Sequence, residues 1–229
     1  MKIKKKGIIF SDLGGVLTET KSIWEELNLE MGMTREEDYQ LYDQFINHKI
    51  DYPAWADKIF NIWRKRSPEK LNRSFLEDFF KSNLKIRRGA KEFIRKCKED
   101  FYLIIISGTP HINLEIIQNE LDFHNYYSTN YFAFNSNNQL KRIKGFKFGF
   151  EKNRIMNAIL DFCGFDSRDS IAIGDSENDI KMLNEANLGI LVGENIIYHK
   201  LYVELNQNVI KLKKVDFDRI LKIIHHKFL

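Results

Sequence analysis

The feature that most constrains the fold is a series of short apolar runs, rich in isoleucine, that alternate with amphipathic segments. Runs of this kind, without polar alternation, are typical of strands that are buried on both faces. They occupy residues 7–10, 102–106, 170–173, 189–192 and 209–210. Apolar residues recur at helical spacing between them, at 91–99, 153–162 and 179–186. The alternation predicts an α/β fold with a doubly wound parallel sheet and helices on both of its faces.

One long interval breaks this alternation. Residues 19–85 contain no strand-like run, and their aromatic and aliphatic side chains fall at roughly helical spacing. We therefore predict a helical domain at 19–85, inserted into a core made of 1–18 and 86–229. All three tryptophans, Trp24, Trp55 and Trp63, lie in this interval. An aromatic substrate box is one interpretation of them, but at such spacings we favour core packing.

Two smaller segments complete the expected secondary structure. Alternating runs at 131–134 and 139–143 flank the polar sequence 135–138, which predicts a β-hairpin. The stretch 216–229 has the pattern of a closing helix, and we expect its pair His225 and His226 to be solvated rather than metal-binding.

Composition narrows the class of partner. Lysine plus arginine, 36, against aspartate plus glutamate, 32, leaves a net charge of +4, which favours small phosphorylated metabolites over nucleic acid. No apolar segment approaches the ~20 residues of a membrane helix, and the lysine-rich opening leads into no signal-peptide core. The two cysteines lie outside any metal-binding spacing, so we expect a reducing, cytoplasmic location. The oligomeric state stays open.

Acidic residues follow two of the predicted strands. Asp12 ends the first run and precedes Gly14, and the string from Gly174 to Asp179 places Asp175 and Asp179 four residues apart. Helix capping would account for one of these acids but not for the whole string, which also contains Asn178. Ligands of open α/β sheets bind outside the carboxyl ends of the strands. Carboxylates brought together there repel unless a cation such as Mg²⁺ neutralises them.

Two further sites have phosphate-binding character. Ser107, Gly108 and Thr109 follow the second predicted strand, where a hydroxyl and backbone N–H groups suit phosphate oxygens, although Ser107 or Thr109 would serve equally as a helix N-cap. Lys152 lies in a lysine-rich stretch, and by itself it would be expected to be solvated.

The order and spacing of these residues resemble those of the haloacid dehalogenase-like hydrolases, with their Rossmann-like core, and especially of their phosphoserine phosphatase-like branch. The resemblance covers nearly the whole chain. It implies a Mg²⁺-dependent phosphatase in which Asp12 is the nucleophile and forms an aspartyl-phosphate, while Ser107 and Lys152 hold the phosphoryl group. It further implies that Asp12, the Gly14 carbonyl and Asp175 bind the metal, and that the helical insert is a cap. Asn178 and Asp179 would orient the site from behind.

The chain departs from the family pattern at two positions. Gly14 stands where phosphatases of this family usually carry the aspartate that acts as general acid and base, so we expect slow turnover, with water, Thr18 or Glu19 as substitutes. A protein that binds phosphate or a partner without turnover is the alternative. Lys21 stands where serine-phosphate enzymes carry a glutamate, so phosphoserine is not the expected substrate. Phosphonate cleavage, through Lys49 or Lys58 of the insert, ranks lower.

Overall fold

The computed structural model describes residues 5–145, 151–193 and 205–228, and its centre is a seven-stranded sheet in the order β4-β3-β2-β1-β5-β6-β7. All neighbouring strands are parallel except β3 and β4. The strands are β1 (Gly7–Ser11), β2 (Phe101–Pro110), β3 (Asn125–Phe134), β4 (Leu140–Gly145), β5 (Ser170–Gly174), β6 (Leu188–Val192) and β7 (Val209–Leu212). The predicted doubly wound α/β fold is thereby confirmed, and each of the five predicted buried runs is a strand.

Helices cover both faces of the sheet, and successive residues of each central strand face opposite layers. Ile9 of β1 packs in one cluster with α5 (Ala90–Asp100), α6 (His111–Leu121) and α10 (Phe217–Phe228). Its neighbours Ile8 and Phe10 pack in another cluster with α7 (Lys152–Cys163) and α8 (Ile180–Glu185). Burial on both faces explains why the strands read as unbroken apolar runs.

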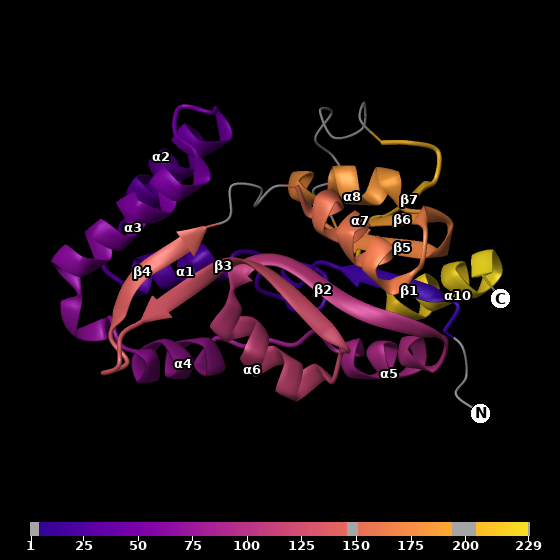
Figure 1. Ribbon diagram of the computed structural model, residues 1–229, viewed down its shortest axis with the longest axis horizontal. Coiled ribbons are helices and arrows are strands. Elements are labelled where there is room, and N and C mark those ends of the chain that lie inside the picture. Colours follow the sequence, from indigo (N-terminus) through magenta and orange to yellow (C-terminus); the bar gives the residue numbers. More distant parts are fainter. Residues whose placement is uncertain (1–4, 146–150, 194–204, 229) are drawn as a thin grey trace.

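Apart from an isolated bridge between Asn72 and Gln139, the regular structure of residues 19–85 is helical. It comprises α1 (Ile23–Glu30), α2 (Arg35–Ile46), α3 (Tyr52–Arg66), the short 3₁₀ helix Pro68–Lys70 and α4 (Arg73–Ser82). A bridge between Thr18 and Ile86 brings the two ends of the segment together. Figure 1 shows α1–α4 gathered with β4 at one end of the molecule, away from β5–β7. We call residues 19–85 the helical insert.

The hairpin β3–β4 joins the two parts. The first half of β3, from Asn125, pairs with β2 in parallel, and the second half of β3 pairs with β4 antiparallel. Phe132, Leu140 and Ile143 of the hairpin pack in one hydrophobic cluster with Trp63 and other side chains of the insert. The hairpin therefore belongs to the core sheet by its backbone and to the insert by its side chains.

Three features of the fold differ from the sequence-based expectation. Strand β2 continues through Ser107 to Pro110 with an irregularity in its pairing, so the expected loop there is part of the strand. Helix α6 follows directly, without a side-chain cap, so neither Ser107 nor Thr109 caps it. Strand β3 begins at Asn125, six residues before the run at 131–134 that predicts it, and these first residues are largely polar. Among the described residues, no helix combines the length and the apolar character needed to cross a bilayer.

Candidate active site

The site forms where three adjacent parallel strands end. Asp12 follows β1, which lies between β2 and β5, and its backbone N–H donates to the Ile173 carbonyl of β5 at 2.9 Å. Ser107 comes from β2 and Asp175 directly follows β5. The parallel topology thus brings together side chains that lie up to 163 positions apart in the sequence (Asp12 to Asp175).

A buried lysine pairs with two of the carboxylates. Lys152 Nζ lies 2.9 Å from Asp12 Oδ1 and 2.6 Å from Asp179 Oδ1. Burial by itself would lower the pKa of Lys152, but the two carboxylates outweigh it and raise this pKa above its ordinary value. Lys152 sits at the start of α7 and is only 3% exposed, so the solvated alternative for this residue is wrong.

Asp179 holds its neighbours in place. Its Oδ2 accepts hydrogen bonds from the Asp175 N–H and the Ser176 N–H, both at 3.1 Å, and from the Ser176 hydroxyl at 3.0 Å. Its Oδ1 accepts from Lys152. Because both oxygens are engaged and the residue is fully buried, Asp179 is a poor candidate for direct metal binding and is well placed to orient Asp175 and Lys152.

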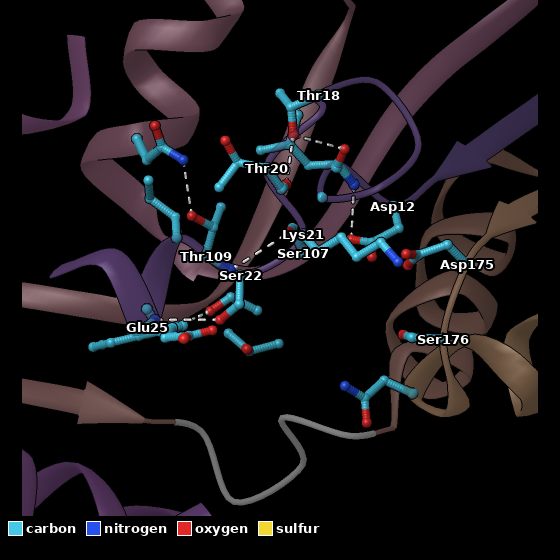
Figure 2. A pocket seen from close by; sticks show the side chains of 18 of the residues that line it. Asp12, Thr18, Thr20, Lys21, Ser22, Glu25, Ser107, Thr109, Asp175 and Ser176 are labelled. Atoms are coloured by element: carbon cyan, nitrogen blue, oxygen red, sulfur yellow. Dashed lines mark hydrogen bonds between the residues drawn. The ribbon is translucent and has the colours of Figure 1, made fainter. Parts of the chain in front are cut away.

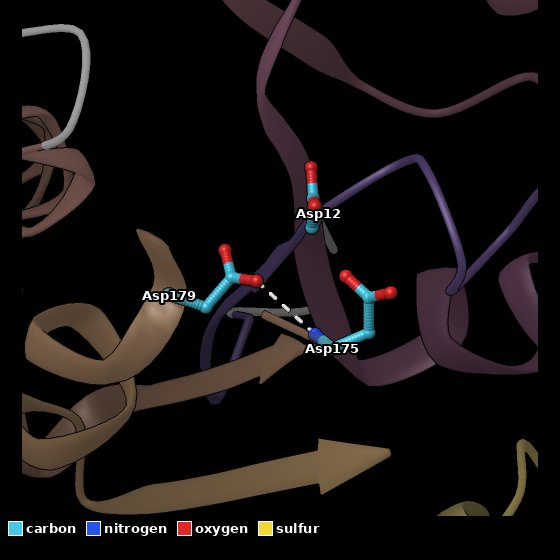
Figure 3. A group of neighbouring side chains, drawn as sticks. All are labelled: Asp12, Asp175 and Asp179. Atoms are coloured by element: carbon cyan, nitrogen blue, oxygen red, sulfur yellow. Dashed lines mark hydrogen bonds between the residues drawn. The ribbon is translucent and has the colours of Figure 1, made fainter. Parts of the chain in front are cut away.

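The three carboxylates carry more negative charge than the lysine compensates. One carboxylate oxygen from each of Asp12, Asp175 and Asp179 lies within 4.8 Å of the others. Figure 3 shows the three side chains grouped at the ends of the strands. Burial, together with Asp12 and Asp179, raises the pKa of Asp175 to about 8, and burial also raises that of Asp12 despite the opposing effect of Lys152. A donor set of carboxylate oxygens with surplus charge suits a hard divalent cation.

The segment Ser107–Thr109 forms the opposite side of the site. Ser107 Oγ accepts a hydrogen bond from the Thr109 N–H at 3.3 Å, and Thr109 Oγ1 accepts from the Asn113 amide at 2.9 Å. Ser128 of β3 donates to the Thr109 carbonyl at 2.7 Å. These contacts fix the segment at the end of β2.

A single cavity of about 610 Å³ joins these groups to the insert. Figure 2 shows Asp12, Ser107 and Asp175 facing it, beside Lys21 and Ser22. Of the site residues predicted from the sequence, the structure brings all but the fully buried Asp179 to its wall: Asp12, Gly14, Ser107, Gly108, Thr109, Lys152, Asp175 and Asn178.

Comparison with known proteins places this arrangement in a family. The family model described as haloacid dehalogenase-like hydrolase matches residues 9–184, which include every one of these site residues. The chain belongs to the haloacid dehalogenase-like hydrolases. A phosphoserine phosphatase from Archaeoglobus fulgidus is 28% identical over 189 residues, which cover 82% of this chain and 52% of that protein. The chain thus spans about half the length of this curated relative.

Solved structures of the same type share the fold. A structure described as substrate-bound phosphoserine phosphatase superimposes with a TM-score of 0.74 at 22% identity, covering 96% of this chain and 99% of the other. A phospho-aspartyl intermediate analogue of phosphoserine phosphatase superimposes with a TM-score of 0.70 at 23% identity, with the same coverage. These likenesses extend over both the sheet and the helical insert.

In this haloacid dehalogenase-like chain, position 14 has no room for a side chain, which explains the glycine there. A Cβ atom built on Gly14 would lie 2.5 Å from the backbone carbonyl oxygen of Lys21. The backbone of Gly14 has no positive φ, so the approach of the segment that enters the insert, and not backbone strain, excludes a side chain. The next residue, Gly15, has a φ of 68° and its Cβ would lie 2.0 Å from Asp175 Oδ2.

Neither proposed substitute for the missing acid lies free in the cavity. Thr18 lines the cavity, but its hydroxyl is 3.2 Å from the carbonyl oxygens of Leu13 and of Thr20, to which it donates. Glu19 is not among the lining residues. Lys49 and Lys58, considered for phosphonate chemistry, do not line the cavity either; Lys58 donates to Gln44 on the insert's surface at 3.0 Å.

Sequence reasoning missed Arg87, which holds the loop that follows Asp12, residues 13–18. Arg87 donates from Nε to the Val16 carbonyl at 3.1 Å, and from Nη2 to the carbonyls of Gly15 at 3.1 Å and Thr18 at 3.3 Å. Nothing in its sequence context, Arg87-Arg88 after a polar turn, separates it from a surface arginine.

Two further residues that bear on the site were missed. Trp24 Nε1 donates to the Gly108 carbonyl at 2.8 Å, and the Asn130 amide donates to the same oxygen at 2.6 Å. Core packing correctly describes Trp63, which is fully buried, but Trp24 and Trp55 also line the cavity.

Proposed function

We propose that the protein is a Mg²⁺-dependent phosphomonoester hydrolase that acts on a small phosphorylated metabolite through an aspartyl-phosphate at Asp12. The observation that carries this proposal is the arrangement of Asp12 between Lys152, whose Nζ lies 2.9 Å from its Oδ1, and the Asp175 carboxylate, all on the wall of one cavity with Ser107. Membership of a hydrolase family and the likeness to phosphoserine phosphatases support it.

Each residue has a role that follows from its place. Asp12 Oδ1 is held by Lys152 and by the Leu13 N–H at 2.7 Å, so Oδ2 is the oxygen left to attack phosphorus. Lys152, the Ser107 hydroxyl and the backbone around Gly108 would neutralise and orient the phosphoryl oxygens. The P–O bond to the leaving group breaks as the Asp12–phosphorus bond forms, and water then releases inorganic phosphate and regenerates Asp12.

The donor set fits a magnesium ion. Asp12, the Gly14 carbonyl and Asp175 would hold it, where it would neutralise phosphoryl oxygens and keep both carboxylates ionised. Asp179 and Asn178 would support this site from behind, and Asn178 Oδ1 is buried without a hydrogen-bond partner among the described residues. Residues 19–85 would serve as the cap over the cavity, and residues 1–18 with 86–229 as the catalytic domain.

The relatives' substrate is not carried over to this chain. Lys21, nine residues after Asp12, lines the cavity, and its ammonium group would repel the ammonium group of an amino-acid substrate. The cytoplasmic location remains a prediction that rests on the free thiols Cys97 and Cys163.

Hydrolysis of acetyl phosphate, whose good leaving group needs no acid, tests the function. The purified protein with Mg²⁺ should hydrolyse it well above the rate of Asp12→Asn, and chelation of the metal should abolish the difference. Beryllofluoride with Mg²⁺, which mimics an aspartyl-phosphate, should raise the melting temperature of the wild type but not of Asp12→Asn. Turnover no faster than that of Asp12→Asn would favour the alternative of a phosphate-binding or partner-binding protein.

A further inference from the structure

Many of the side chains that the insert contributes to the cavity are aromatic, beside the charged Glu25, Arg35 and Asp38. Six aromatic side chains of the insert line the cavity together with the active-site residues. Leaving aside Tyr39, which is 69% exposed, we call the other five the aromatic wall: Trp24, Tyr42, Phe45, Tyr52 and Trp55. Their ring centroids lie close together, with 5.3 Å between Trp24 and Trp55 and 5.2 Å between Tyr52 and Trp55. The rings come from three different helices, α1, α2 and α3, so the wall is built by the tertiary packing of the insert.

Hydrogen bonds tie this wall to the predicted phosphate-binding segment. Trp24 Nε1 donates to the Gly108 carbonyl at 2.8 Å. The Asn130 amide contacts both the Tyr52 hydroxyl and, at 2.6 Å, the same Gly108 carbonyl. A ligand whose phosphoryl group lies between Asp12 and Ser107 therefore has the wall at a fixed position for the rest of its structure.

Trp55 carries a polar group that the described part of the chain does not satisfy. Its side chain is 5% exposed, and Nε1 is buried with no hydrogen-bond partner among the described residues. A buried indole N–H is expected to have a partner. An acceptor on a ligand bound against the wall would provide one.

The loop that follows Asp12 limits which leaving groups can depart readily. The loop that follows Asp12, residues 13–18, contains no carboxyl side chain, and the Lys21 carbonyl leaves no space for one at Gly14. The two carboxyls of the insert that also line the cavity are already engaged, since Glu25 pairs with Arg35 and Asp38 accepts a hydrogen bond from Asn28 at 2.6 Å. General acid catalysis contributes roughly 10²–10⁴ in rate, so the lack of an acid at position 14 penalises alkoxide leaving groups most. A phenolate, which is stable without prior protonation, departs with little of this penalty.

We propose, on the basis of the hydrolase function above, that the substrate is an aryl phosphate whose aromatic ring packs against the aromatic wall. Asp12 Oδ2 forms a bond to phosphorus while the phosphorus–phenolate oxygen bond breaks. The phenolate leaves with the electron pair and takes its proton from water. A second water hydrolyses the aspartyl-phosphate, so that the net products are a phenol and inorganic phosphate.

Four phosphates separate the two parts of this inference. Phenyl phosphate has both the ring and the good leaving group, acetyl phosphate has only the leaving group, benzyl phosphate has only the ring, and cyclohexylmethyl phosphate has neither. We expect phenyl phosphate to have a higher kcat/KM than benzyl phosphate, because phenolate is the better leaving group. Benzyl phosphate should exceed cyclohexylmethyl phosphate roughly 2- to 10-fold, the range of aromatic contacts. Phenylphosphonate, which is not cleaved, should inhibit more strongly than methylphosphonate by a similar factor.

Tyr42→Ala tests the wall because Tyr42 is 44% exposed, so its truncation leaves the fold intact. The ratio of kcat/KM for phenyl phosphate to that for acetyl phosphate should fall roughly 2- to 10-fold. Trp55→Phe, which keeps a ring but removes the N–H, should weaken inhibition by phosphonates whose ring carries an acceptor. Phe162→Ala is the matched control, because Phe162 is 92% exposed on α7 and does not line the cavity; its ratio should equal that of the wild type.

The outcomes distinguish the two proposals. If acetyl phosphate is hydrolysed faster than by Asp12→Asn, but Tyr42→Ala keeps the wild-type ratio and phenylphosphonate binds no better than methylphosphonate, the aromatic substrate class is wrong while the hydrolase function stands. If neither acetyl nor phenyl phosphate is hydrolysed above Asp12→Asn, both proposals are overturned.

Discussion

Replacement of Gly14 by alanine should destabilise the protein. The added Cβ would lie 2.5 Å from the Lys21 carbonyl oxygen and 3.4 Å from that of Thr20. Because both atoms belong to the backbone, the segment between Gly14 and Lys21 has to move to accept the added Cβ atom. Overpacking of this kind costs about 1–3 kcal/mol. For a chain of this size that corresponds to a fall in melting temperature of roughly 2–12 °C.

Urea and thermal unfolding measure this cost against a matched control. Gly108 lies at the same edge of the sheet, but its Cβ would approach nothing closer than Thr129 Oγ1 at 3.9 Å, an ordinary contact. Gly108→Ala should therefore change the unfolding free energy by less than about 1 kcal/mol. Equal midpoints for Gly14→Ala and Gly108→Ala would refute the argument from space.

The same geometry predicts that the missing acid is not restored by Gly14→Asp. Its carboxylate has no room beside Lys21 and adds a fourth negative charge near Asp12, Asp175 and Asp179. We expect kcat/KM for benzyl phosphate to stay level or fall. A gain of tenfold or more would show that the loop accommodates an acid at this position and would contradict the reasoning.

Three further perturbations test other parts of the structure. Arg87→Lys keeps the charge but removes the guanidinium group that donates to three carbonyls, so it should lower the unfolding free energy by about 1.5–3 kcal/mol in urea titration. An unchanged midpoint would mean that these hydrogen bonds do not stabilise the loop. Mg²⁺ at about 100 times its Kd should add ~2.7 kcal/mol to the unfolding free energy, and Asp175→Asn should lose most of this in calorimetry, with sodium at equal ionic strength as control. Burial, with a smaller effect of Arg73, lowers the pKa of His111 to about 4. Its contribution is fully present above about pH 6.5 and is lost as the pH falls through 4, so wild type should lose about 1–2 kcal/mol more than His111→Gln over that range, allowing for partial exposure; parallel stability curves would contradict this.

The strands and the meeting of the acids followed from the sequence because each depends on a strong, simple signal. Doubly buried strands are unbroken apolar runs, and parallel strands end at one edge, so Asp12 and Asp175 had to approach each other. The first half of β3 could not be predicted as a strand because its residues, such as Ser128 and Asn130, are polar. They are buried there because they bond to the carbonyls of Thr109 and Gly108, partners that only the tertiary structure supplies.

The predicted site was incomplete for the same reason. Arg87 and Trp24 act through hydrogen bonds to backbone carbonyls 69 or more positions away in the chain. Because every residue has a backbone carbonyl, the residue type of the acceptor gives no sign of such a bond. The clash at Gly14 likewise depends on where the Lys21 backbone passes. Spacing within one segment shows none of these relations.

The β3–β4 hairpin pairs with the core sheet and also packs on the insert, and this limits which segments can be exchanged between this protein and its relatives. If the insert were replaced by that of a relative, with the chain joined at Thr18 and Ile86, the hairpin side chains Phe132, Leu140 and Ile143 would remain. They would then face side chains of an insert that packs against a different hairpin. Removal of the insert would expose the same three side chains on an edge hairpin, a surface prone to self-association. A unit that can be transferred to another protein therefore consists of two segments, the helical insert and the β3–β4 hairpin on which it packs.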